Sequence, residues 1–276
     1  MNIRHLLSQA GVDLTAFPES RLEAEILMCH VLGVSRAWLY ANSDLTIQDE
    51  KKQRFAQWVK QRANGEPVAY ITGTREFWSL PLHVTPDVLI PRPETELLVE
   101  TALTLIPESI PLRIVDLGTG SGAVALSIAS ERPQCEVLAT DISEAALAVA
   151  RENSKRLELT HITFHHGSWL SAVTGSFHAV VSNPPYINRS DPHLEQGDCR
   201  FEPEVALTPG QDGLISIRVI ATDAFSLLEK GGFLAVEHGY DQGPDCREFF
   251  RSLGYQDVRT AKDLAGLERV TSGLKP

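Results

Sequence analysis

Strand-like and helix-like segments alternate along much of the chain, and this alternation constrains the fold more than any other feature. Apolar runs predict strands at 113–117, 136–140, 162–164, 177–181 and 233–236, and extended pieces near 256–260 and 267–272 could finish the sheet. Helical patterns lie between most of them, at 123–130, 144–157, 214–229 and 248–253. Strands that alternate with helices of this length form a parallel sheet covered on both faces. The sequence therefore predicts an α/β fold with a doubly wound, mainly parallel, seven-stranded sheet.

The N-terminal part of the chain has a different pattern, in which apolar side chains recur at helical spacing. One such stripe is formed by Leu22, Ile26, Leu27 and Val31. A second stripe follows, and Thr46 with Asp49 three residues later resembles a capping box at its start. We therefore predict a small all-α bundle over residues 1–72, a hairpin or linker over 73–92 and a second domain over 93–276.

The charge is uneven along the chain, and it bears on the partners to be expected. The chain carries 25 Lys and Arg against 36 Asp and Glu, a formal net charge of −11. The first 80 residues hold 9 of each kind, so the remainder carries the whole excess of acid. Binding of free duplex nucleic acid depends on Lys and Arg that neutralise phosphates. We therefore expect no free nucleic acid as a direct substrate.

The cysteines and the first residues indicate a reduced, cytoplasmic protein. The four cysteines, Cys29, Cys135, Cys199 and Cys246, form no C-x-x-C pair. Residues 1–14 are too polar for the apolar core of a signal peptide, and no apolar run approaches the ~18 residues of a membrane span. The adjacent His165 and His166 fall on a predicted strand, where they would point to opposite faces. We expect no metal site and no membrane attachment.

A glycine-rich turn joins the first predicted strand of the sheet to its helix. Gly118, Thr119, Gly120, Ser121 and Gly122 follow Asp116 and Leu117 in the sequence. Glycines let the backbone turn sharply and approach a ligand, and the following helix offers free N–H groups. Asp141, at the end of the next strand, can accept both hydroxyls of a ribose. The G-x-G-x-G spacing differs from the G-x-G-x-x-G dinucleotide pattern, so S-adenosylmethionine fits better than NAD.

The fourth predicted strand ends in Asn183, Pro184, Pro185 and Tyr186, followed by the poorly patterned segment 187–213. Proline fixes φ and has no N–H, so these residues form a rigid shelf of acceptors suited to a substrate N–H. A tight turn is the alternative interpretation. Both motifs stand at carboxyl ends of strands, where open α/β sheets bind ligands. If the strand order reverses beside the first strand, they face one crevice.

The chain resembles, over nearly its whole length, the bacterial release-factor glutamine methyltransferases, a family of protein-(glutamine-N5) methyltransferases. The motifs that carry the resemblance are Arg75 to Trp78, Pro91 to Glu96, Asp116 to Gly122, Asn183 to Tyr186, Phe201 to Pro203 and Glu237 to Gly239. Asn-Pro-Pro-Tyr alone is shared with amino-methyltransferases that act on adenine. The resemblance implies a Rossmann-like class I methyltransferase domain after the helical N-terminal domain.

The resemblance also implies an activity and a set of site residues. The activity is transfer of a methyl group from S-adenosylmethionine to the Gln side chain of a Gly-Gly-Gln motif in class I peptide chain release factors. Gly118 to Gly122 would hold the methionine end and backbone side of the cofactor, Asp141 the ribose and Trp169 the adenine, while Asn183 bridges cofactor and substrate. The family pattern has Asp at position 168, so Ser168 puts one adenine contact in doubt.

The reaction itself suggests roles for the second motif. An amide nitrogen is a poor nucleophile because its lone pair is delocalised into the carbonyl. We expect the Asn183 side-chain oxygen and the Pro184 carbonyl to accept the two substrate amide hydrogens, while Pro185 and Tyr186 complete the shelf and Tyr186 packs on the amide face. No strong base is needed, because an N-methylated amide cation loses its proton to water.

Three other functions stay open from the sequence. The chain could methylate a glutamine of a ribosomal protein, methylate N6 of adenine in nucleic acid, or bind a nucleoside without catalysis. The acidic charge argues against nucleic acid. We expect a monomer whose N-terminal helices recognise the release factor.

Overall fold

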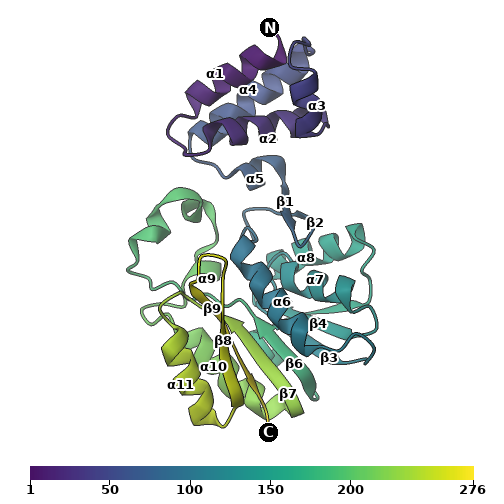
Figure 1. Cartoon of the computed structure of the whole chain (residues 1–276), viewed down its shortest axis with the longest axis vertical. Coiled ribbons are helices and arrows are strands. Elements are labelled where there is room, and N and C mark those ends of the chain that lie inside the picture. The colour runs from purple at the N-terminus through teal and green to yellow at the C-terminus, as the bar shows by residue number, and fades with distance from the viewer. The chain divides into compact units, whose positions relative to one another are not determined.

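The computed structural model describes residues 1–276, apart from the side chain of Ala172. It separates into two compact units, Met1–Thr74 and Arg75–Pro276. Figure 1 shows helices alone in most of the first unit and a sheet flanked by helices in the second.

The first unit consists of helices around a small apolar core. These are α1 (Ile3–Asp13), α2 (Ser20–Leu32), α3 (Arg36–Ala41), α4 (Asp49–Ala63) and α5 (Val68–Thr72). Leu27, Met28 and Phe55 lie in the core. The predicted capping box is wrong: Gln48 precedes α4, without a side-chain cap bond in the described structure, and Thr46 instead pairs with Asn2 in an isolated bridge. The pairing places the Thr46 backbone in an extended segment that precedes the helix.

A short hairpin follows, as the sequence predicts for this segment. Strands β1 (Thr74–Phe77) and β2 (Leu80–His83) form a two-stranded sheet. Trp78 and Ser79 in the turn have φ of 50° and 61°. Positive φ at both central residues is the geometry of a type I′ hairpin turn, which usually takes Asn or Gly.

The second unit is built on the predicted seven-stranded sheet. Its strands are β3 (Arg113–Leu117), β4 (Glu136–Asp141), β5 (Ile162–His166), β6 (Phe177–Ser182), β7 (Leu228–Glu237), β8 (Gln256–Lys262) and β9 (Glu268–Leu274). Within the described residues their order is β5-β4-β3-β6-β7-β9-β8. Neighbours from β5 to β7 pair in parallel, and β9 runs antiparallel to β7 and to β8. The expected mainly parallel sheet is confirmed.

Helices cover both faces of this sheet, as Figure 1 shows. They are α6 (Glu96–Leu105), α7 (Ala123–Glu131), α8 (Glu144–Arg156), α10 (Ile215–Leu227) and α11 (Gly243–Leu253). Successive strand residues point to opposite faces. Accordingly, Ile114 and Val181 pack in one core with α6 and α7, whereas Val115 and Val180 pack in a second core with α10 and α11. The alternation in the sequence thus reflects a sheet that is apolar on both sides.

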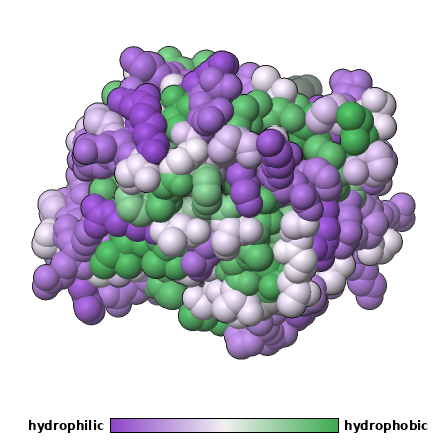
Figure 2. All heavy atoms as spheres, turned by 90° about the horizontal axis from the view of Figure 1, so that it is seen from below, coloured by the Kyte–Doolittle hydropathy of each residue, from purple (hydrophilic) through white to green (hydrophobic). Residues whose placement is uncertain are grey.

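The segment 187–213 contains short helical turns that the sequence pattern did not indicate. They are η3 (Pro192–Glu195), η4 (Gly197–Phe201) and α9 (Glu204–Leu207). Two other single turns, η1 (Pro93–Thr95) and η2 (Trp169–Ala172), begin α6 and follow β5. No helix among the described residues is long and apolar enough to cross a membrane. Hydrophilic and apolar side chains are interspersed on the face in Figure 2.

Candidate active site

The strand order places the two sequence motifs side by side. Strand β3 lies between β4 and β6. The chain runs from β3 to β4 and β5 on one side and then crosses back to β6 on the other side, so the strand order reverses at β3. The glycine turn follows β3, Asp141 ends β4 and Asn183 follows β6. The predicted neighbourhood of the two motifs at one crevice is therefore observed.

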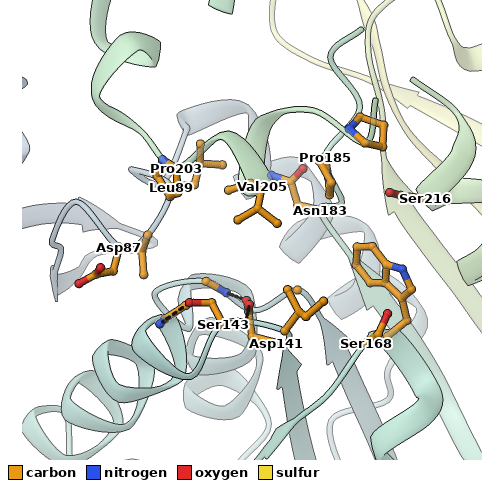
Figure 3. A pocket seen from close by; sticks show the side chains of 18 of the residues that line it. Asp87, Leu89, Asp141, Ser143, Ser168, Asn183, Pro185, Pro203, Val205 and Ser216 are labelled. Atoms are coloured by element: carbon orange, nitrogen blue, oxygen red, sulfur yellow. Dashed lines mark hydrogen bonds between the residues drawn. The ribbon is translucent and has the colours of Figure 1, made fainter. Parts of the chain in front are cut away.

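A cavity of about 320 Å³ opens at this crevice. Six of the predicted site residues line it: Gly118, Gly120, Asp141, Trp169, Asn183 and Pro185. Figure 3 shows Pro203 and Val205 across the cavity from Asp141 and Ser143. Thr119 and Ser121 line a smaller cavity of about 50 Å³ beside it. Gly122, Pro184 and Tyr186 are not among the residues that line either of these two described cavities.

The glycine turn has a backbone that few other residues adopt. Gly118, Gly120 and Gly122 have φ of 69°, 56° and 86°, where a side chain adds strain. A Cβ on Gly122 would lie 2.8 Å from Leu126 Cδ1, and one on Gly118 would lie 3.2 Å from the Trp169 ring. The turn thus needs glycine both for its shape and for its close approach to neighbouring side chains.

The buried side chain of Asp116 stabilises the glycine turn through hydrogen bonds. Its Oδ2 accepts hydrogen bonds from Thr119 Oγ1 at 2.7 Å and from the Ala125 N–H at 3.2 Å. Asp116 is almost fully buried, with 1% of its surface exposed. Burial raises the pKa of this carboxyl to about 7, although both hydrogen bonds favour the charged form.

Asp141 joins the turn to the end of β4. Its Oδ2 accepts the Gly120 N–H at 2.9 Å, and its Oδ1 accepts the Ser143 N–H at 2.9 Å. Burial raises its pKa, and backbone hydrogen bonds from Ser143 and Gly120 oppose the shift. A carboxylate has about four acceptor positions. Backbone N–H groups thus occupy part of this capacity, and the Asp141 carboxylate lines the cavity as a hydrogen-bond acceptor.

Trp169 and Ser168 form another wall of the cavity. Trp169 has φ of 48°, and its carbonyl accepts a hydrogen bond from Thr140 Oγ1 at 3.1 Å. The bond holds this unusual backbone in place, and the indole ring lies close to Gly118. Ser168 lines the cavity with a small uncharged side chain.

The Asn183 side chain is oriented by a hydrogen bond. Its Nδ2 donates to Thr95 Oγ1 at 3.0 Å, which leaves the carbonyl oxygen Oδ1 available as an acceptor. Tyr186 donates its hydroxyl to Glu237 Oε1 at 3.1 Å, and its own backbone carbonyl accepts from Gln242 Nε2 at 3.1 Å. The motif is therefore tied at both ends to side chains from other parts of the unit.

The comparisons with known proteins agree with this geometry. Residues 3–73 match the PrmC N-terminal domain, and residues 93–197 match the methyltransferase small domain. The release factor glutamine methyltransferase of Escherichia coli (strain K12) is 46% identical over 274 residues, 99% of each chain. This chain belongs to the release factor glutamine methyltransferase family. Another member, from Coxiella burnetii, is 46% identical over 272 residues, 98% of each chain.

A solved structure agrees with the fold assigned to this family member. A crystal structure of a methyltransferase from Pyrococcus furiosus is 20% identical and matches with a TM-score of 0.54. The match covers 71% of this chain and 89% of the other. The expected Rossmann-like methyltransferase fold and the expected methyltransferase class are confirmed.

Two buried polar residues of this family member support the site and were not singled out individually in the sequence. Asn153 on α8 donates through Nδ2 to the carbonyls of Ser121 and His83, both at 2.9 Å. Glu202 accepts the Ile90 N–H at 2.9 Å and pairs with Arg92. Asn153 ties the glycine turn to the hairpin, and Glu202 fixes the segment that carries Pro203 and Val205. Phe201 to Pro203 was a signal for Glu202, whereas Asn153 has none in the local pattern.

Proposed function

We propose that this chain transfers the methyl group of S-adenosylmethionine to the side-chain amide nitrogen of the Gln in the Gly-Gly-Gln motif of class I peptide chain release factors. S-adenosylhomocysteine is the other product. Family membership at 46% identity over 99% of the chain supports the reaction. The main structural support is the orientation of the Asn183 side chain. Its Nδ2 donates a hydrogen bond to Thr95, so its Oδ1 is available as an acceptor beside the cavity.

The cavity residues fit a nucleoside with a cationic sulfur and a short amino-acid chain. In the proposal, the turn from Gly118 to Gly122 holds the methionine end, Asp141 accepts the ribose hydroxyls and Trp169 lies beside the adenine. Positive φ along the turn brings backbone groups close to the ligand. When bound, S-adenosylmethionine supplies an electrophilic methyl group on a good leaving group. No metal takes part in the proposed reaction.

The protein must supply orientation and a suitable lone pair on the substrate amide. Asn183 Oδ1 and the Pro184 carbonyl accept the two amide hydrogens, and Tyr186 packs against the amide plane. Alignment of reacting groups contributes up to ~7–11 kcal/mol in favourable cases. Loss of one polarising hydrogen bond from such a site costs roughly 10²–10³ in rate. The proton released after transfer goes to water, so no catalytic His or Lys is required.

The first unit is proposed to recognise the release factor. It matches the PrmC N-terminal domain, it is helical, and its charge is near neutral while the rest of the chain is acidic. In the proposal, residues 1–72 bind the protein substrate, the enzyme acts as a monomer and free nucleic acid is not a substrate. Action on release factors modulates translation termination and takes place in the cytoplasm.

One labelling assay tests the proposal. The purified enzyme is incubated with tritiated S-adenosylmethionine and a release factor, the same factor with its motif Gln changed to Ala, a ribosomal protein or DNA. We expect label in the unaltered release factor alone. Equal label in the Gln→Ala factor, or label in DNA or the ribosomal protein in its place, would refute it. Cofactor binding without label in any substrate would favour a module without catalysis.

A further inference from the structure

Two buried residues, Thr95 and Glu237, make hydrogen bonds to the Asn-Pro-Pro-Tyr motif. Thr95 ends the turn η1 and is 4% exposed, and Glu237 ends β7 and is 1% exposed. Thr95 Oγ1 accepts the hydrogen bond of Asn183 Nδ2 at 3.0 Å. Tyr186, at the other end of the same motif, donates to Glu237 Oε1 at 3.1 Å. The two residues therefore contact the first and last side chains of the Asn-Pro-Pro-Tyr motif.

When it is ionised, Glu237 can only accept hydrogen bonds, and this fixes the direction of the bonds around it. Glu237 Oε2 is buried and has no hydrogen-bond partner by distance and angle among the residues that the structure describes. Burial raises the pKa of Glu237 to about 7, and hydrogen bonding to the hydroxyls of Thr95 and Tyr186 opposes this shift by favouring the charged form. A hydroxyl that accepts one bond still has its proton to donate. A small rotation of the Thr95 hydroxyl supplies the donor that the buried carboxylate lacks.

We propose that Thr95 and Glu237 are positioning residues that hold the Asn183 amide with Oδ1 toward the substrate. The inference deepens the proposed function and rests on it. An Asn amide is almost symmetric in shape, and rotation by half a turn would present N–H groups to the substrate N–H groups. The carboxylate accepts from Thr95, so the Thr95 oxygen is left as an acceptor for Asn183 Nδ2. The hydrogen bonds from Asn183 to Thr95 and from Thr95 to Glu237 therefore favour the orientation in which Asn183 Oδ1 faces the substrate amide.

The variants Thr95→Val and Thr95→Ser separate this role from simple packing. Valine has nearly the shape of threonine but removes the hydroxyl, whereas serine keeps it. We expect Thr95→Val to lower kcat about tenfold, which corresponds to loss of one buried hydrogen bond. KM for the release factor and the affinity for S-adenosylmethionine should stay within about twofold of the unaltered enzyme, because the release factor and the cofactor make most of their contacts elsewhere. Thr95→Ser should restore most of kcat.

Thr104→Val is the matched control, since it makes the same substitution on the exposed side of α6. The Thr104 hydroxyl bonds only within that helix, to the Glu100 carbonyl at 2.9 Å. We expect unchanged kcat. Unchanged kcat in Thr95→Val, equal losses in the Val and Ser variants, or a parallel loss of cofactor affinity would overturn the inference.

A spectroscopic measurement keeps the test independent of turnover. The side-chain amide signals of Asn183 are assigned in ¹H–¹⁵N spectra by their loss in Asn183→Asp. We expect one strongly shifted amide proton in the unaltered enzyme and in Thr95→Ser, and loss of that shift in Thr95→Val. An unchanged signal in Thr95→Val would refute the hydrogen-bond chain. Absence of label in the release factor with the unaltered enzyme would instead refute the proposed function.

Discussion

Replacement of Asp116 by Asn should remove a pH dependence of stability that burial of this carboxyl imposes. Asp116 is 1% exposed, and its pKa in the folded unit is about 7 against an ordinary value of 3.8. The folded state therefore binds this proton more strongly than the unfolded state. The stabilisation is complete below the ordinary pKa and is lost as the pH rises through about 7.

The size of the effect follows from the shift in pKa. Each unit corresponds to about 1.4 kcal/mol, so a shift of roughly three units amounts to about 4 kcal/mol in total. About 3 kcal/mol of this falls between about pH 5 and pH 8. Asn has no proton to lose in this range, and its side-chain oxygen can still accept from Thr119 and Ala125. The unfolding free energy of the unaltered protein minus that of Asp116→Asn should therefore fall by about 3 kcal/mol over this range.

Urea unfolding followed by circular dichroism in steps from about pH 5 to pH 8 measures this difference. The matched control is Asp223→Asn, which removes the same charge from an exposed position on α10. In the control, the difference in unfolding free energy should stay nearly constant. A constant difference for Asp116→Asn, or a ¹³C titration of Asp116 with a midpoint near its ordinary pKa, would refute the reasoning.

Three further substitutions test the site and its turn. Asn183→Ala should lower kcat roughly 10²–10³-fold while cofactor affinity is retained, because it removes an acceptor aimed at the substrate amide; equilibrium dialysis and the labelling assay measure both. Asp141→Ala should weaken S-adenosylmethionine binding about 10–100-fold, as expected for loss of hydrogen bonds to a charged group, and calorimetry measures it. Gly122→Ala should destabilise the second unit by about 2–5 kcal/mol, through positive φ and the contact with Leu126 Cδ1, and urea unfolding measures it.

Each of these has an outcome that contradicts it, and the last two have a matched control. Unchanged turnover in Asn183→Ala would remove the proposed amide clamp. Glu144→Gln, a neighbour of Asp141 with an exposed side chain, should leave cofactor affinity unchanged, and an equal loss there would argue against a specific ribose contact. Gly231→Ala is the control for Gly122→Ala. Gly231 also has a positive φ, of 80°, but no atom lies within 4 Å of a Cβ added there. If Gly231→Ala destabilises as much as Gly122→Ala, the contact with Leu126 contributes little.

Features that depend on local pattern could be predicted from the sequence. Runs of apolar residues and the glycine turn located the strands, the helices and the crevice beside β3. Asp141 was found because a carboxylate at the end of a second strand has a recognisable spacing from the turn. The capping box failed because a short polar motif before a helix can equally belong to an extended bridge, as Thr46 does.

Features that depend on distant contacts could not be predicted in this way. Thr95 meets Asn183 across 88 positions of sequence, Asn153 meets His83 across 70, and Glu202 meets Ile90 across 112. Nothing in the local pattern of a polar residue states which distant backbone group it will bond. The helical turns of 187–213 were missed for a related reason, since each is too short to show a periodic stripe.

The order of the last two strands has a consequence for synthesis of the protein. Strand β9 follows β8 in the chain but lies between β7 and β8 in the sheet. While the chain grows on the ribosome, β8 therefore emerges before the strand that attaches it, and the edge of β7 stays open until residues 268–274 appear. An open edge can pair with other chains. This side of the sheet is complete only after β9 has been synthesised. A nascent chain arrested before β9 would therefore expose the unpaired edge of β7.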